Sequence, residues 1–243
     1  MATIPIVEEY VAALVTGNRI TSREFVQQQI SQIEDVTKLY KDLLWPAMER
    51  VEKLFRGDRI NRAAQQMAIR IHRAIADQVQ SRLPRLPTNG KRIVITCAEG
   101  EPEELGAQMS ADLFESCGWD VYFVGSGVPN DEILNLVGQL SPDILLIFGT
   151  QPSGVPGTRR LIDLIREIGV NPTMNVMVSG GVFNRADGLW KEVNADLIAK
   201  TVHEAIPMAE SIGPRAPEAK VMGAPKKRRR RRRPVGVGEA ATV

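Results

Sequence analysis

The sequence feature that most constrains the fold is a series of short apolar runs between residues 92 and 210, separated by segments of helical period. The runs occupy residues 93–95, 121–124, 144–148 and 176–178. Strands that are apolar throughout are typical of a parallel sheet covered by helices on both faces. We therefore predict an α/β fold with five β/α units and a doubly wound, flavodoxin-like, five-stranded parallel sheet. Such sheets bind ligands at the carboxyl ends of their strands, so a pocket is expected there.

The first part of the chain has a helical pattern instead. Residues 6–83 contain almost no strand signal, and their apolar residues recur at three- and four-residue intervals, as one buried helical face requires. Thr21 and Glu24 have capping-box spacing and predict a helix start. Pro46 suits the first turn of another helix. We predict a four-helix bundle over residues 1–84.

Composition marks two further boundaries. The proline-punctuated segment 84–90 is typical of a hinge between domains, so the second domain is expected over residues 90–212. Residues 213–243 form a predicted disordered basic tail with eight consecutive positive charges. The whole chain has a formal net charge of +2, so the rest of it is mildly acidic. The tail is expected to bind a polyanion, with nucleic acid favoured over a membrane surface or an acidic protein. Its charged residues are Lys226, Lys227, Arg228, Arg229, Arg230, Arg231, Arg232 and Arg233.

Several classes of protein are disfavoured. No apolar stretch is long enough to span a membrane, and the first residues do not resemble a secretory signal. Two cysteines without metal-ligand spacing indicate neither a disulfide framework nor a zinc site, so a cytoplasmic protein is expected. Two distant histidines allow no catalytic triad. No Gly-x-Gly-x-x-Gly motif follows the first strand, which argues against a dinucleotide site.

Two loops at predicted strand ends carry polar residues. Four glutamates, Glu99, Glu101, Glu103 and Glu104, precede a helix. Acidic residues near a helix N-terminus contribute about 0.3–1 kcal/mol each, and this structural role explains most of the pattern. The glycine-rich loop that begins with Gly149 and Thr150 could hydrogen-bond a ligand edge or serve only as a connection.

The order of several short segments resembles the cobalamin-binding module shared by methionine synthase, corrinoid carrier proteins and B12-dependent photoreceptors. The segments are 44–51 (LWPAMERV), 118–121 (GWDV), 178–181 (VSGG) and 194–200 (NADLIAK). The resemblance covers roughly residues 6–210. It implies that the four-helix bundle is a cap over the carboxyl ends of the strands, and that cobalamin or another tetrapyrrole binds between them.

The ligand motifs of that family are degenerate in this sequence. The family's Asp-x-His-x-x-Gly loop, whose His binds cobalt, corresponds to residues 101–106, where Glu103 replaces the His and Gly106 remains. A carboxylate is a poor substitute for imidazole on cobalt(III). The family's Ser-x-Leu segment, which lines the nucleotide tail, corresponds to Phe148-Gly149-Thr150, where an aromatic ring is expected to fill part of the slot. The Gly180-Gly181 pair is intact.

The cap departs from the family in the same way. Light-sensing relatives carry a Trp followed after nine residues by Glu-His, and the corresponding positions here are Phe55, Gln65 and Gln66. His72 lies seven residues beyond Gln65, on the same helix face. It is either a metal ligand from the cap side or a polar residue at the domain boundary.

These patterns leave three functions open. The favoured one is a non-enzymatic sensor or regulatory module that binds cobalamin with its own base retained, or another tetrapyrrole. Its expected cofactor-binding residues are Glu103, Gly106, Gly149, Thr150, Gly180, Gly181, Gln65, Gln66 and His72. The alternatives are a scaffold protein without a ligand and a corrinoid carrier subunit of a methyltransferase.

Overall fold

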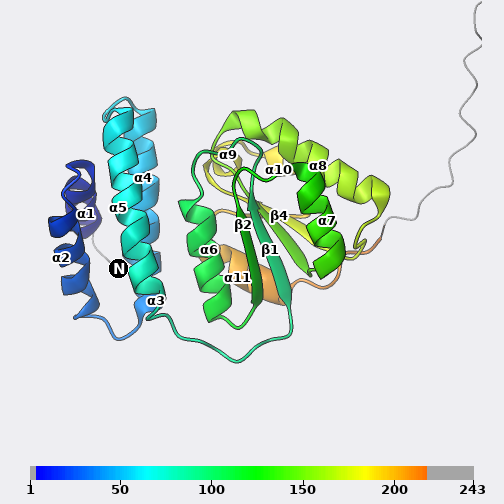
Figure 1. Ribbon diagram of the computed structural model, residues 1–243, viewed down its shortest axis with the longest axis horizontal. Helices are drawn as coiled ribbons and strands as arrows, with labels where there is room; N and C mark the ends of the chain where they lie inside the picture. The colour runs from blue at the N-terminus through cyan, green and yellow to red at the C-terminus, as the bar shows by residue number, and fades with distance from the viewer. Residues whose placement is uncertain (1–3, 218–243) are drawn as a thin grey trace, which may run out of the picture.

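A helical cap lies beside a layered α/β domain in the computed structural model, which describes residues 4–217 (Figure 1). The cap consists of α1 (Ile4–Val15), α2 (Arg19–Ile30), α3 (Val36–Leu39), a π-helical turn (Tyr40–Leu44), α4 (Trp45–Arg56) and α5 (Arg62–Gln80). Segment 36–56 is helical without interruption, so the described part of the cap has the four predicted helices. No helix of residues 4–217 has the length and apolar character needed to cross a membrane.

Side chains of asparagine set two helix starts in the cap. The Asn18 side chain accepts hydrogen bonds from the backbone N–H groups of Ile20 and Thr21, and α2 begins at Arg19. The prediction that Thr21 opens this helix is therefore wrong, because Asn18 satisfies the free N–H groups three residues earlier. Asn61 caps α5 in the same way through the N–H of Ala64.

Pro46 lies within a continuous helix and does not start a new one. The backbone N–H of Trp45 donates to the carbonyl of Tyr40, five residues earlier, which is the hydrogen bond of a π-turn. A proline in a regular helix would clash with the carbonyl four residues before it. The wider turn at Tyr40–Leu44 lets the chain pass Pro46 and remain helical.

The second part is a five-stranded parallel sheet, and the predicted fold class is confirmed. Its strand order is β2-β1-β3-β4-β5, all pairs are parallel, and β1, β3 and β4 lie in the interior of the sheet. The strands are β1 (Arg92–Cys97), β2 (Asp120–Gly125), β3 (Ile144–Phe148), β4 (Asn175–Ser179) and β5 (Leu197–Ala199). The order reverses between β1 and β3, where a doubly wound sheet forms its ligand crevice.

Helices cover both faces of the sheet. On one face, α6 (Leu105–Ser116) and α11 (Val202–Ser211) pack with the cap against inward residues such as Ile93 and Leu146. On the other face, α7 (Asn130–Leu140) and α8 (Val155–Ile168) pack against residues such as Val94 and Leu145. The short helices α9 (Gly181–Arg185) and α10 (Leu189–Glu192) follow β4, and a 3₁₀ turn (Pro152–Gly154) precedes α8.

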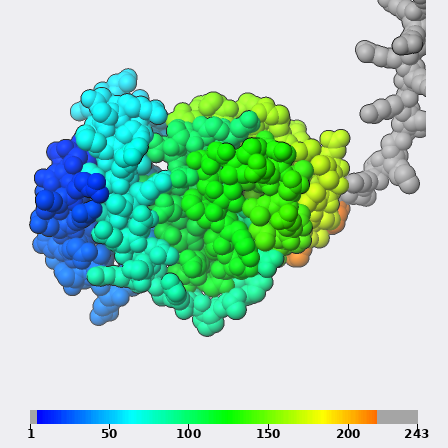
Figure 2. Space-filling view, viewed as in Figure 1, coloured from blue at the N-terminus to red at the C-terminus, as the bar shows by residue number. Residues whose placement is uncertain are grey.

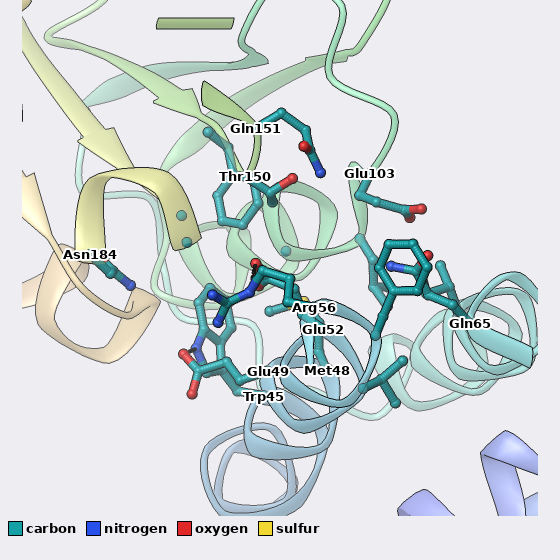
Figure 3. A pocket seen from close by; sticks show the side chains of 18 of the residues that line it. Trp45, Met48, Glu49, Glu52, Arg56, Gln65, Glu103, Thr150, Gln151 and Asn184 are labelled. Atoms are coloured by element: carbon teal, nitrogen blue, oxygen red, sulfur yellow. Dashed lines mark hydrogen bonds and ion pairs between the residues drawn. The ribbon is translucent and has the colours of Figure 1, made fainter. Parts of the chain in front are cut away.

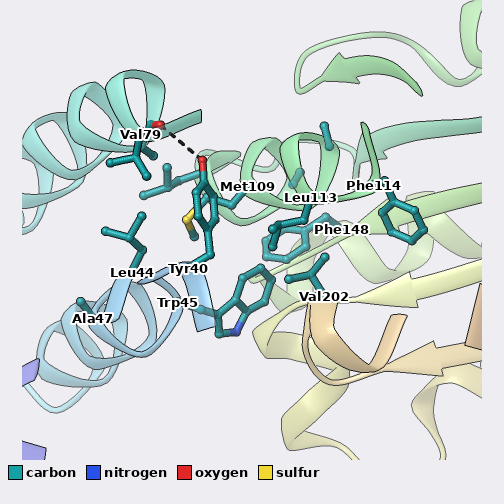
Figure 4. Packing of buried hydrophobic residues seen from close by; sticks show 14 of the residues in the cluster. Tyr40, Leu44, Trp45, Ala47, Val79, Met109, Leu113, Phe114, Phe148 and Val202 are labelled. Atoms are coloured by element: carbon teal, nitrogen blue, oxygen red, sulfur yellow. Dashed lines mark hydrogen bonds between the residues drawn. The ribbon is translucent and has the colours of Figure 1, made fainter. Parts of the chain in front are cut away.

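The cap and the sheet share one hydrophobic cluster. Buried residues of the cap, including Tyr40, Leu44 and Trp45, pack in the same cluster as Met109 of α6 and Val202 of α11 (Figure 4). The two parts meet over a broad contact in the space-filling view (Figure 2). This docking holds α4 and α5 over one end of the sheet.

The proline-rich segment between the two parts is attached to the α/β domain. The N–H of Leu86 donates to the carbonyl of Ser116 over 3.0 Å, and the N–H of Asn89 donates to that of Gly118 over 2.9 Å. A Cβ atom at Gly118 would lie 2.2 Å from the carbonyl oxygen of Pro87, and Gly118 has a φ of +84°. The predicted hinge is thus fixed along the turn between α6 and β2.

Candidate functional site

A pocket lies between the cap and the carboxyl ends of the strands (Figure 3). Its empty volume is about 740 Å³ out to the open mouth, and only about 80 Å³ of it can hold the centre of a water molecule. The pocket is therefore a narrow cleft. Its walls are formed by Trp45, Met48, Glu49, Val51, Glu52, Phe55, Arg56, Gln65 and Ile69 of the cap, and by Glu103, Leu105, Gly106, Phe148, Thr150, Gln151, Gly180, Gly181, Asn184 and Lys200.

Most of the predicted site residues converge on this cleft. Six of them line it: Gln65, Glu103, Gly106, Thr150, Gly180 and Gly181. Two others lie directly behind the lining. The Gln66 amide donates to Glu103 Oε1 over 2.8 Å, and the backbone of Gly149 supports Gly180. Gly149 and Thr150 are expected from the strand-end pattern, because parallel strands end at one edge of the sheet, whereas Gln65, Gln66 and Glu103 were identified through the family resemblance.

His72 does not lie in the cleft. Its side chain is 1% exposed inside the cap, and its ring packs edge-on against the ring of Tyr10 with centroids 5.6 Å apart. Burial lowers the pKa of His72 to about 4, so it is neutral at physiological pH. The prediction that His72 faces the cleft as a metal ligand is wrong. Within residues 4–217 there is no group of three or more His, Cys, Asp or Glu side chains placed to hold a metal ion.

The floor of the cleft is closed by an aromatic ring. Phe148, at the end of β3, is 3% exposed, and its ring lies against Gly106 of α6. A Cβ atom at Gly106 would lie 2.3 Å from Cζ of this ring. Glycine is thus required at position 106 by the ring itself. The expected filling of the slot by Phe148 agrees with this contact, which leaves no space for a ligand arm between β3 and α6.

Glu103 occupies the position expected for a cobalt ligand. It is partly buried, and this burial is the main cause of a raised pKa, with the charge of Glu101 adding to the effect. The hydrogen bond from Gln66 and the nearby Arg62 and Arg73 act in the opposite direction. Glu103 is thus held by the cap through Gln66, as a hydrogen-bond acceptor at one end of the cleft.

Glu101 has a role that the sequence pattern did not reveal. Its carboxylate is 5% exposed and accepts hydrogen bonds from the backbone N–H of Thr150 and from the Thr150 hydroxyl, each over 2.6 Å. It also accepts from the N–H groups of Gln151 and Glu103. This carboxylate therefore joins the loop after β1 to the loop after β3. Hydrogen bonds to a buried charge are strong, so Glu101 fixes the shape of the cleft wall.

Several polar contacts tie the cap to the strand ends. Arg185 of α9 pairs with Glu52 of α4 over 2.7 Å and also donates to the carbonyl of Thr150. Arg73 of α5 pairs with Glu104 over 2.9 Å, and Glu104 in turn accepts hydrogen bonds from the N–H and hydroxyl of Ser126. These contacts join the cap and the strand ends around the cleft.

Close packing explains the glycine pair after β4. Gly180 has a φ of +99°, and a Cβ atom there would lie 2.3 Å from the carbonyl oxygen of Gly149. At Gly181 a Cβ atom would lie 2.5 Å from Nη1 of Arg185 and 2.8 Å from Oε1 of Glu52. The glycines let the loops after β3 and β4 approach each other and the cap.

The arrangement favours binding over catalysis. The middle of the cleft is apolar, with Trp45, Met48 and Phe55 opposite Leu105 and Phe148. Polar groups lie toward its ends. Such a cleft suits a flat ligand held by its faces and edges. The predicted polyanion-binding residues, Lys226 to Arg233, lie outside the described residues.

Comparison with known families gives two matches, one for each part of the chain. A sequence model described as a B12 binding domain matches residues 91–210, and a second one with the same description matches residues 6–79. Together they cover both the α/β domain and the cap.

The chain is also similar to individual proteins over most of its length. It is 21% identical over 215 residues to dimethylamine corrinoid protein 1 of Methanosarcina acetivorans, covering 87% of this chain and 99% of that protein. It is 22% identical over 188 residues to dimethylamine corrinoid protein 2 of Methanosarcina mazei, covering 76% and 86%. The monomethylamine corrinoid protein of Methanosarcina barkeri has the same fold, with a TM-score of 0.75 at 17% identity over 84% of this chain and 97% of that one.

Proposed function

Because the chain belongs to the family of B12-binding domains with a helical cap, we propose that it is a corrinoid-binding protein and not itself an enzyme. The observation that carries this proposal is the cleft itself, which is lined from both family segments at the point where α4 and α5 face the strand ends. A flat macrocycle would lie with its faces between Trp45 and Met48 on the cap side and Leu105 and the glycine loops on the sheet side.

The residues present do not fit every mode of corrinoid binding. Glu103 replaces the imidazole that would bind cobalt from below, and the Phe148 ring closes the space beneath Gly106. A nucleotide arm inserted between β3 and α6 would therefore meet a packed ring. The ligand that this cleft suits is a corrinoid held above the strand ends, without a protein imidazole below it. When bound, a corrinoid supplies a cobalt centre that can carry a methyl group.

Of the three roles considered from the sequence, the carrier role has the most support. The relatives matched over most of their length are named as corrinoid proteins, and the fold of one such protein extends over nearly the whole described chain. The proposed protein partner is accordingly a methyltransferase. The sensor role stays a prediction from the sequence, as does nucleic-acid binding by the tail.

One observation favours the scaffold alternative. The cleft is narrow, and the contacts from Gln66 to Glu103 and from Arg185 to Glu52 cross it between the cap and the strand ends. A protein that never admits a ligand would gain stability from these contacts. The two roles differ in whether the cleft opens for a macrocycle.

The proposal is tested by incubating the purified protein with hydroxocobalamin or dicyanocobinamide, removing free ligand by gel filtration, and recording the absorption spectrum. We expect retention of about one corrinoid per chain. Met48→Trp, which fills the cleft, should reduce retention, whereas Met67→Trp on the outer side of the cap should not, since Met67 is 44% exposed and does not line the cleft. Absence of retained colour with either corrinoid would overturn the proposal in favour of the scaffold.

A further inference from the structure

An ion pair fills the space beside the glycine pair at the end of β4. Gly181 lines the cleft, and a Cβ atom there would lie 2.5 Å from Nη1 of Arg185 and 2.8 and 3.0 Å from the two carboxylate oxygens of Glu52. These two side chains pair with each other over 2.7 Å. The space that glycine leaves free of a side chain is therefore occupied by a charged pair.

The two partners come from opposite sides of the cleft. Glu52 belongs to α4 of the cap, one turn after Met48, and it lines the cleft. Arg185 is the last residue of α9, which follows the strand end of β4. The side chains of Glu52 and Arg185 are 27% and 32% exposed. The pair thus bridges the two walls between which a flat ring would lie.

Each partner also has a second contact on its own side of the cleft. Glu52 pairs with Arg56, one turn later on α4, over 3.4 Å, and the two side chains lie next to each other in Figure 3. Arg185 donates from Nη2 to the carbonyl of Thr150 over 2.8 Å. When the bond between Glu52 and Arg185 breaks, the carboxylate keeps a cation and the guanidinium keeps an acceptor. Breaking the pair therefore removes one contact and leaves neither charge without a partner.

The other charged groups beside this pair add little to hold it closed. Burial raises the pKa of Glu49, the hydrogen bond from Trp45 opposes the shift, and the negative charge of Glu52 adds to it, so the two carboxylates repel each other. Lys200 also lines the cleft, but it is exposed and forms no ion pair among residues 4–217. Partly exposed ion pairs contribute little to stability. The contact between Glu52 and Arg185 is therefore easily broken.

We propose that the Glu52–Arg185 ion pair is a gate, which covers Gly181 until a flat ring binds there and opens by rotation of the two side chains without movement of the cap. The inference rests on the proposed function and deepens it, since the gate sets how tightly a ring is retained. Because a partly exposed pair is weak, opening the gate should raise the dissociation constant of a ligand by no more than about fivefold.

The test measures binding of dicyanocobinamide, a corrinoid with no nucleotide arm and no net charge. Titration of the full-length protein, followed by absorption, gives the dissociation constant. Glu52→Gln and Arg185→Gln each remove one charge of the gate and should tighten binding on the order of three- to fivefold. The double variant should bind no more tightly than the single variants, because all three lack the same ion pair.

The matched control is Glu8→Gln. Glu8 of α1 pairs with Arg50 of α4 over 2.7 Å, the same distance as in the gate, and its side chain is 45% exposed. Neither Glu8 nor Arg50 is among the residues that line the cleft. Loss of this pair should leave the dissociation constant of dicyanocobinamide unchanged.

Salt provides a second measurement of the same contact. Raising sodium chloride from about 20 mM to about 500 mM shortens the screening length from roughly 20 Å to roughly 4 Å and weakens a partly exposed ion pair. The wild-type protein should therefore bind the neutral ligand more tightly at high salt, and either gate variant should respond less. One folded gate variant is sufficient for this comparison, so the proposal stays testable when the other variant fails to fold.

The possible outcomes separate the gate from the proposed function. Equal affinity of the wild type and both gate variants, or weaker binding by the variants, would overturn the gate and leave the proposed function in place. Binding by the gate variants and not by the wild type would support both. Failure of every one of these proteins to bind at millimolar ligand would overturn the proposed function, and the gate with it.

Discussion

At the scale of single residues, Gly106 and Phe148 show how two positions far apart in sequence depend on each other. The ring of Phe148 occupies the volume that a side chain at position 106 would need. Neither residue can be replaced without affecting the other, and together they set the depth of the cleft.

The contact between Gly106 and Phe148 predicts that substitutions at the two positions have non-additive effects on the free energy of unfolding. Gly106→Ala should lower the free energy of unfolding by about 1–3 kcal/mol, since its methyl group would overlap the ring. Phe148→Ala should lower it by about 3–5 kcal/mol, because it leaves a cavity. In the Phe148→Ala background, Gly106→Ala should cost little, because the methyl group enters that cavity. Urea unfolding of the four proteins measures the coupling, and strictly additive values would contradict the proposed contact.

Asp112 is a second residue of interest, because its position raises its pKa. It lies on α6 facing the cap, 3.1 Å from the hydroxyl of Tyr40. Burial, with smaller contributions from the charges of Asp77 and Glu115, raises its pKa to about 7, and the hydrogen bond from Tyr40 opposes the shift. The folded state therefore binds the Asp112 proton more tightly than the unfolded state does.

The raised pKa of Asp112 determines whether the folded protein gains or loses stability as the pH rises. The stabilising contribution of protonated Asp112 is fully present below the usual aspartate pKa of about 4 and is lost as the pH rises through about 7. Asp112→Asn should therefore reduce the loss of stability between pH 5 and pH 8. Thermal unfolding of both proteins across this range provides the measurement. The same slope in wild type and variant would show that Asp112 ionises normally.

At the scale of elements, the loops that form the cleft are held by a buried carboxylate. Glu101 joins the loop after β1 to the loop after β3 through Thr150. Neither loop has regular structure at this point. The Glu101 hydrogen bonds therefore hold the two loops together where the backbone hydrogen bonds between β1 and β3 end.

Removing the charge of Glu101 should loosen both loops. Glu101→Gln places an amide where two donors now converge, and we expect a loss of about 1.5–3 kcal/mol of stability. Amide hydrogen exchange of residues 149–153 should become faster in this variant. Glu99→Gln is the matched control on the same loop, because Glu99 is exposed and pairs with the exposed Arg160. Unchanged exchange in Glu101→Gln would contradict the role assigned to it.

The elements themselves were predictable, but most contacts between them were not. Runs such as 144–148 identify buried strands because every residue in them is apolar, and the structure confirms the sheet. His72 was misplaced because helical spacing relates it to Gln65 without showing where the cleft ends. Seven residues advance a helix by about 10.5 Å. At the position of His72, α5 packs against Tyr10 of α1 and not against the strand ends. Glu101 was assigned to a helix start and to the family loop over residues 101–106, but its contact with Thr150 was not predicted, since the two residues are 49 positions apart.

At the scale of the whole molecule, the cap and the sheet form one folded unit. A single hydrophobic cluster contains Tyr40, Leu44 and Val79 of the cap together with Ile95 of β1 and Met109 of α6. The linker between the two parts is bonded to the α6–β2 turn, which restricts movement of the cap further.

Excision of the cap should therefore unfold the remainder or cause it to aggregate. A fragment of residues 84–217 would expose the apolar face of α6 to water, and each large residue uncovered there costs roughly 1.5–3 kcal/mol. We expect no cooperative thermal transition for this fragment, while residues 4–217 should show one. Calorimetry of the two fragments decides the matter. A soluble 84–217 fragment with a sharp transition would show that the sheet does not need the cap.

The shared cluster also limits how this protein can change over evolutionary time. Where two domains meet through a polar interface, recombination can exchange one for its counterpart from a distant homologue. Here Tyr40 and Met109 pack in the same interior, so a substitution on one side requires an adjustment on the other. The two halves are expected to be inherited together, and grafts of a foreign cap onto this sheet should be productive only when α6 is transplanted with it.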